Sequence, residues 1–131
     1  MTKGLSLDDH LDLMRKGVAD AILCISDKSR SDLDSDRITQ LAVVKAIENI
    51  GETAGDIMAE HPAFAEAETG IDWRGWKKAR NRLNHGYHSI DYDLVWQMVT
   101  GDIPKLSESP QAIADYDDLK ASGRMRDGPN R

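Results

Sequence analysis

Residues 73–88 read WRGWKKARNRLNHGYH, and this stretch predicts an amphipathic helix that carries much of the positive charge of the chain. No acidic residue lies between Asp72 and Asp91, although the whole chain has a formal net charge of -6. A cationic segment on an acidic protein indicates an anion-binding site. The large side chains follow steps of three and four residues, which places them on one helical face: Trp73, Trp76, Arg80, Leu83 and Tyr87.

Arg80 falls on this apolar face rather than on the solvated flank. The stem of an arginine can pack between aromatic residues while its guanidinium stays at an edge, so Arg80 can be a snorkelling residue with no function. The alternative is phosphate binding, because a planar guanidinium holds two phosphate oxygens at once. His85 and His88 add imidazoles that exchange protons near neutral pH. The residue types alone leave both interpretations open.

The spacing of Arg80 and His85 constrains any shared site. On an unbroken helix these positions lie about 140° apart, too far round to share one face. Their convergence therefore requires a helix end at Asn84 to His85, or a second copy of the chain. Gly86 is expected to end or bend the helix there.

The rest of the chain predicts further helices and no strand. Ser6 and Asp91 are placed to cap helices, and Gly51 inside the second helix indicates close helix packing. Inward faces are expected to include Ile22 in the first helix and Leu41 in the second. The expected segments are helices at 6–27, 37–61, 73–85, 91–101 and 109–122, a connection at 27–36, a short loop at 63–70 with room for a helical turn, and a turn at 102–104.

The fold prediction is an all-α, up-and-down four-helix bundle with a short additional C-terminal helix. Residues 1–122 form a single domain, and residues 123–131 are a flexible tail. No apolar run approaches the roughly 20 residues of a membrane span, so a cytoplasmic protein without membrane association is expected.

Residues 80–87 read RNRLNHGY, which resembles the signature of the HEPN superfamily of nucleotide-binding and ribonuclease domains. With a tyrosine two residues after the histidine, the motif resembles that of the HepT branch of this superfamily. HepT proteins are the toxins of bacterial toxin–antitoxin pairs in which the antitoxin is a minimal nucleotidyltransferase (MNT). The resemblance extends over roughly residues 7–121. Flanking segments that match are 46–52 (AIENIGE), 71–73 (IDW), 90–96 (IDYDLVW) and 102–106 (DIPKL).

The resemblance implies a HEPN-like fold and a metal-independent endoribonuclease that cuts mRNA or tRNA through attack by the 2′-hydroxyl. In that chemistry His85 is the candidate general base and Arg80 the candidate phosphate clamp. Asn81, Lys77 and Arg82 are the expected RNA or phosphate contacts. No metal and no cofactor is expected, and His85 with His88 lacks further ligands for a metal.

The same resemblance implies a homodimer, an MNT antitoxin as partner, and Tyr87 as the residue to which that partner attaches AMP. One histidine cannot easily be both base and acid, and members of the superfamily build a composite cleft from two subunits. Four large aromatic residues add to the expectation of an apolar dimer surface: Trp73, Trp76, Tyr92 and Trp96.

Two alternatives to an enzyme remain at this point. The chain can be a non-catalytic HEPN subunit that binds a nucleotide or dimerises within a nucleotidyltransferase complex. It can also be a helical adaptor with a chance motif, although the length of the resemblance disfavours this.

Overall fold

The computed structural model describes residues 4–85 and 89–108, without the side chains of residues 85, 107 and 108. The predicted helix at 109–122, the predicted tail and Tyr87 lie outside the described residues. In the described part no residue is in a strand, as predicted. The elements are α1 (Leu7–Cys24), α2 (Arg30–Ser35), α3 (Arg37–Glu60), α4 (Pro62–Ala67), α5 (Trp73–His85), α6 (Tyr92–Gln97), the π-helical turn η2 (Met98–Asp102) and α7 (Ile103–Glu108).

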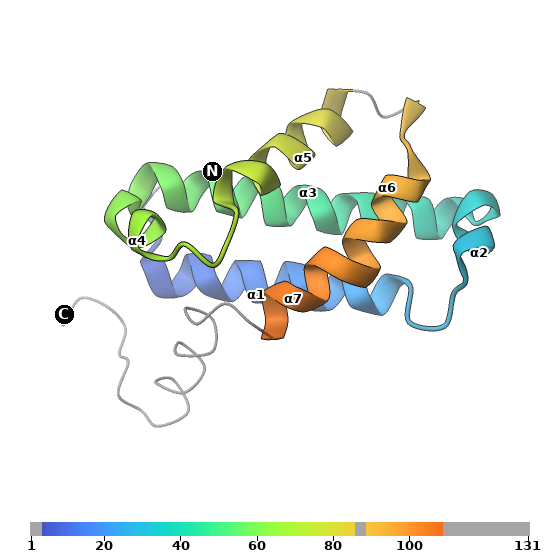
Figure 1. Ribbon diagram of the computed structural model, residues 1–131, viewed down its shortest axis with the longest axis horizontal. Helices are drawn as coiled ribbons and strands as arrows, with labels where there is room; N and C mark the ends of the chain where they lie inside the picture. The colour runs from blue at the N-terminus through green and yellow to red at the C-terminus, as the bar shows by residue number, and fades with distance from the viewer. Residues whose placement is uncertain (1–3, 86–88, 109–131) are drawn as a thin grey trace.

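The predicted four-helix bundle is confirmed. Two long helices, α1 and α3, run antiparallel along its length, and α5 lies along α3 (Figure 1). The fourth member is the continuous run of α6, η2 and α7, which crosses back over α1 (Figure 1). None of the described helices is long and apolar enough to cross a membrane.

Capping side chains lie at the helix starts that the sequence predicts. Ser6 caps α1 in a reciprocal capping box with Asp9, and Asp91 accepts hydrogen bonds from the first amides of α6. Asp36 caps α3 and accepts hydrogen bonds from the hydroxyl of Thr39 at 2.8 Å and from its amide at 3.2 Å. These two bonds and the nearby Lys28 ammonium hold the pKa of Asp36 below its usual value, so the cap stays charged.

The hydrophobic core lies between α1 and α3 and continues beneath α5 and α7. Its fully enclosed aliphatic members include Ile47, Ile50 and Ile57 on α3. The predicted inward positions of Ile22 and Leu41 are wrong, since these side chains are 38% and 51% exposed. Figure 1 shows that α5 lies along only part of α3 and does not reach the first turns of α3, which agrees with the exposure of Leu41.

The connection predicted at 27–36 contains the short helix α2, which the sequence analysis missed. Ser29 and Asp32 form a capping box at its start, and Leu33 anchors it with 0% of its surface exposed. A six-residue helix has too few turns to show periodicity, so only the capping pair signalled it.

The stop predicted at Gly101 and the turn at 102–104 are also wrong. The helix widens into a π turn at Met98–Asp102 and continues as α7. Ile103 is fully buried and Leu106 is 4% exposed, so burial of these two side chains favours continuation over the local glycine and proline signals.

Candidate active site

The start of α5 is held by Asp72 and by two tryptophans. A carboxylate oxygen of Asp72 accepts the amide of Gly75 at 3.0 Å, which caps the helix. Trp73 is 6% exposed, and its indole N–H donates to the carbonyl of Glu68 at 3.2 Å; Trp76 is 8% exposed. This anchoring turns the basic flank of α5 outward.

The middle of α5 approaches α3 at Gly51, as the sequence predicts. A Cβ atom at Gly51 would lie 2.5 Å from the carbonyl oxygen of Trp76 and would overlap the Cβ of Arg80. One turn further along α3, a Cβ at Gly55 would meet the Lys77 stem at an ordinary 3.4 Å. The missing side chain at Gly51 therefore sets where the backbone of Arg80 sits.

Arg80 is half-buried, with its Cα and Cβ against Gly51. Its Nη1 donates to the Oδ1 of the exposed Asn81 at 2.9 Å. This contact uses one of five N–H donors and limits the directions in which the fork can point. An arginine with a packed Cβ and an oriented fork is suited to hold a planar pair of phosphate oxygens.

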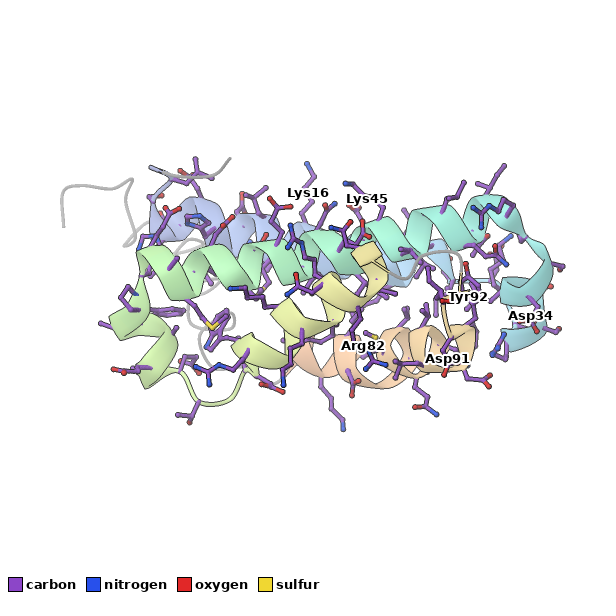
Figure 2. All side chains as sticks on the ribbon, turned by 90° about the horizontal axis from the view of Figure 1, so that it is seen from above. Lys16, Asp34, Lys45, Arg82, Asp91 and Tyr92 are labelled. Atoms are coloured by element: carbon purple, nitrogen blue, oxygen red, sulfur yellow. The ribbon has the colours of Figure 1, made fainter. Side chains whose placement is uncertain are left out.

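The other cations of α5 form an exposed basic surface, which we define as Arg74, Lys77, Lys78 and Arg82. The ion pairs found within residues 4–85 and 89–108 all involve side chains of other elements. Figure 2 shows Arg82 on α5, whereas Lys16 and Lys45 project from the opposite edge of the bundle. The positive charge of α5 is thus exposed to solvent and available to a polyanion.

A hollow of about 460 Å³ lies beside the first turns of α5, between Asp72, Trp76, Met98 and Lys105. Its lining includes the carboxylates of Asp72 and Asp102 and excludes Arg80. Two carboxylates repel a phosphate, so this hollow is a poor candidate for the anion site.

Helix α5 ends at His85. A helix end at this point is what the side chains of Arg80 and His85 need if they are to converge within one chain. Arg80, Asn81, Lys77 and Arg82 therefore lie on one helix, with Arg80 nearest to α3. The His85 side chain, Tyr87 and His88 lie outside the described residues.

Comparison with known proteins finds a matching family, described as "Ribonuclease HepT-like", over residues 14–113. "Probable ribonuclease HepT" of Thermococcus cleftensis is 34% identical over 74% of this chain and 88% of its own length. A "Putative RNase" of Methanocaldococcus jannaschii is 30% identical over 72% of this chain and 84% of its own length. In a "Gamma-glutamylcyclotransferase and putative RNase" of that organism, the match is 35% identical over 63% of this chain and 36% of that protein. No solved structure matches.

Proposed function

Since this chain belongs to the HepT-like ribonuclease family, we propose that it is an endoribonuclease whose active site is built on the second half of α5. The observation that carries the proposal is Arg80: its Cα and Cβ lie against Gly51 and its fork is oriented by Asn81. The exposed basic surface beside it supports an RNA substrate, because its cations attract the phosphate backbone.

The proposed reaction uses the nucleophile that RNA already carries. His85 removes the proton from a 2′-hydroxyl, and the 2′-oxygen attacks the adjacent phosphorus. Arg80 stabilises the negative charge that develops on the phosphorane oxygens. The bond from phosphorus to the 5′-oxygen breaks, and an acid protonates that oxygen. The products are a 2′,3′-cyclic phosphate and a 5′-hydroxyl, and no metal takes part in the step. Lys77 and Arg82 hold flanking phosphates of the RNA.

A homodimer would supply both the base and the acid from two copies of His85. The aromatic residues do not support it, because Trp73 and Trp76 are buried within one subunit. Support comes instead from exposed aliphatic side chains on α1, α3 and α6. In the described part of the single chain, the exposed ones are Leu13 (39%), Ile22 (38%), Leu23 (71%), Ile38 (79%), Leu41 (51%) and Leu94 (36%).

We assign the protein to the toxin half of a HepT/MNT pair, with an MNT-type nucleotidyltransferase as its antitoxin. In this proposal the antitoxin transfers AMP to the hydroxyl of Tyr87. A phosphate-bearing group seven residues after Arg80 would repel the RNA phosphate and block the clamp.

The second candidate function is a non-catalytic subunit that binds a nucleotide or the nucleotidyltransferase. Arg80 and Asn81 would suit a nucleotide phosphate as well as an RNA phosphate.

An RNA cleavage assay distinguishes the ribonuclease from the non-catalytic subunit. Unmodified protein, confirmed by intact mass, is expected to cut RNA in EDTA and leave cyclic phosphate ends. A 3′-hydroxyl product would rule out the proposed mechanism, and uncut RNA would favour the non-catalytic subunit.

Tyr87→Phe is expected to resist silencing by the antitoxin. The phenylalanine keeps the ring but removes the oxygen that accepts AMP, so the variant should keep its cleavage rate after incubation with antitoxin and ATP. Cleavage rate and intact mass are measured together, with the wild type as the protein that gains AMP and loses activity. A Tyr87→Phe variant that still gains AMP and loses activity would place the acceptor elsewhere.

A further inference from the structure

Three potential metal ligands meet where the start of α1 packs against the end of α3, at the opposite end of the bundle from the end of α5 (Figure 1). They are His10 from α1, Glu60 from α3 and His61, which follows Glu60 directly. One ligand atom from each lies within 4.8 Å of the others. The two imidazole rings meet edge to face, with 5.1 Å between their centroids.

His10 is the central observation, because its ring is fully buried and its Nε2 has no hydrogen-bond partner among residues 4–85 and 89–108. Its Nδ1 lies 3.1 Å from the carbonyl oxygen of Ser6. The same Nδ1 also lies 3.2 Å from Nε2 of His61. In the tautomer whose Nδ1–H donates to the Ser6 carbonyl, the lone pair of a neutral ring is on Nε2. A buried lone pair without a donor is costly, and such groups require an explanation.

The surroundings of His10 match those of a metal-bound histidine. Histidine ligands usually donate their second ring N–H to a backbone carbonyl or a carboxylate, which fixes the tautomer and aims the other nitrogen at the ion. The contact from Nδ1 to Ser6 does this for His10. The nearest carboxylate oxygen to Nε2 is Oε1 of Glu60, at 4.0 Å. This distance is too long for a hydrogen bond, but it leaves space for an ion between the two atoms.

We propose that His10, Glu60 and His61 bind a divalent transition-metal ion of the Zn²⁺ type. Two imidazoles and one carboxylate form a ligand set that suits zinc, with water completing a tetrahedral arrangement. Zinc bonds of about 2.0–2.2 Å place neighbouring ligand atoms roughly 3.4 Å apart, so His10 Nε2 and Glu60 Oε1, at 4.0 Å, need to close by less than about 1 Å. Pairs of ligand atoms separated by as much as 4.8 Å need to close by up to about 1.4 Å. Glu60 can make this shift, because it ends α3 and its side chain is 23% exposed.

The ion would tie the first turns of α1 to the last turn of α3. Its role is structural, since Arg80 and the rest of the proposed active site are on α5. The site does not depend on the ribonuclease proposal. The competing explanation is a metal-free cluster, in which His61 Nε2 and His10 Nδ1 share a hydrogen bond at 3.2 Å and Nε2 of His10 carries a proton that faces Glu60. That explanation predicts no affinity for metal ions.

The test is a titration of the full-length, tag-free, chelator-treated protein with Zn²⁺, followed by calorimetry, and with Co²⁺, followed by the visible absorption of tetrahedral cobalt. We expect one ion per chain and a thermal midpoint that rises when Zn²⁺ is added. Glu60→Gln and His61→Ala should each weaken binding by roughly 10- to 100-fold or more and abolish the rise. His10 is left unchanged, because its substitution in the core can prevent folding.

Two variants serve as controls. Glu52→Gln changes an exposed carboxylate on the same helix and should bind Zn²⁺ as the wild type does. A double variant, His85→Ala with His88→Ala, removes the histidines near the proposed active site and should also bind normally. The proposal is overturned if chelator-treated wild type binds neither ion, if both site variants bind with unchanged affinity, or if the double variant loses binding.

Discussion

Replacing Arg80 with alanine is expected to lower the rate constant of RNA cleavage roughly 10²- to 10³-fold, the usual cost of removing a charge-stabilising donor from a transition state. The Arg80 guanidinium is positioned by the packing of its Cβ against Gly51 and by the 2.9 Å contact with Asn81, so its loss removes an oriented group. Arg80→Lys keeps the stem and the charge but not the planar fork, and should restore only part of the rate. Single-turnover cleavage of a defined RNA measures the effect.

The matched control is Arg82→Ala, two residues away on the exposed basic surface. We expect it to weaken RNA binding and to reduce the slope of the logarithm of the binding constant against the logarithm of the salt concentration by about one, the value for one lost phosphate contact. The cleavage rate at saturating RNA should change little. Equal losses of rate in the two variants would contradict a special role for Arg80.

Gly51→Ala is expected to lower the free energy of unfolding by about 1–3 kcal/mol, because the new methyl group overlaps the Arg80 Cβ and the Trp76 carbonyl on α5. The backbone contact cannot be relieved by a rotamer change, so α5 has to move away from α3. Cleavage should therefore fall as well, since the same shift displaces Arg80. Urea unfolding gives the stability, and the cleavage rate is measured where the variant is fully folded.

Gly55→Ala is the control for this prediction. Its methyl group would meet the flexible Lys77 stem at 3.4 Å, an ordinary contact. Alanine is favoured over glycine in a helix by about 1 kcal/mol, so this variant should be as stable as the wild type or more stable. If the two glycine variants have the same stability, close packing at Gly51 is not what positions α5.

Much of this architecture is predictable from local patterns. The caps at Ser6 and Asp91, the end of α3 before Pro62, and the close approach at Gly51 each have a short-range signal in the sequence. On α5, the face that carries Trp73, Trp76 and Leu83 is buried as predicted. The fold class follows from these elements, because helices of this length need one another to bury their apolar faces.

The errors arise where distant contacts decide the outcome. Leu41 belongs to an apolar stripe but is 51% exposed among the described residues, and periodicity cannot show how far α5 extends along α3. At Gly101 and Pro104, burial of Ile103 and Leu106 overrides two helix-breaking residues.

The cluster of His10, Glu60 and His61 could not be predicted in the same way. His10 and His61 are separated by 51 positions and meet only because α1 and α3 run antiparallel. Among the histidines, only His85 and His88 are close in sequence, so local spacing indicates a candidate metal-binding pair only there.

EDTA affects the tests of both the ribonuclease proposal and the metal-site proposal, because it removes a structural ion as well as a catalytic one. Helical content and the thermal midpoint must therefore be recorded in EDTA, and cleavage assayed well below that midpoint. A chain that stays folded in EDTA and still cuts RNA separates the structural ion from the chemistry.

The most direct test of the central claim is cleavage of RNA by wild-type protein and by His85→Ala under these conditions, with end-group analysis of the products. The account predicts 2′,3′-cyclic phosphate ends from the wild type and a loss of roughly 10²- to 10⁴-fold in the variant, as expected when a general base is removed. Equal cleavage by both proteins, or no cleavage by folded wild type without AMP, would contradict it.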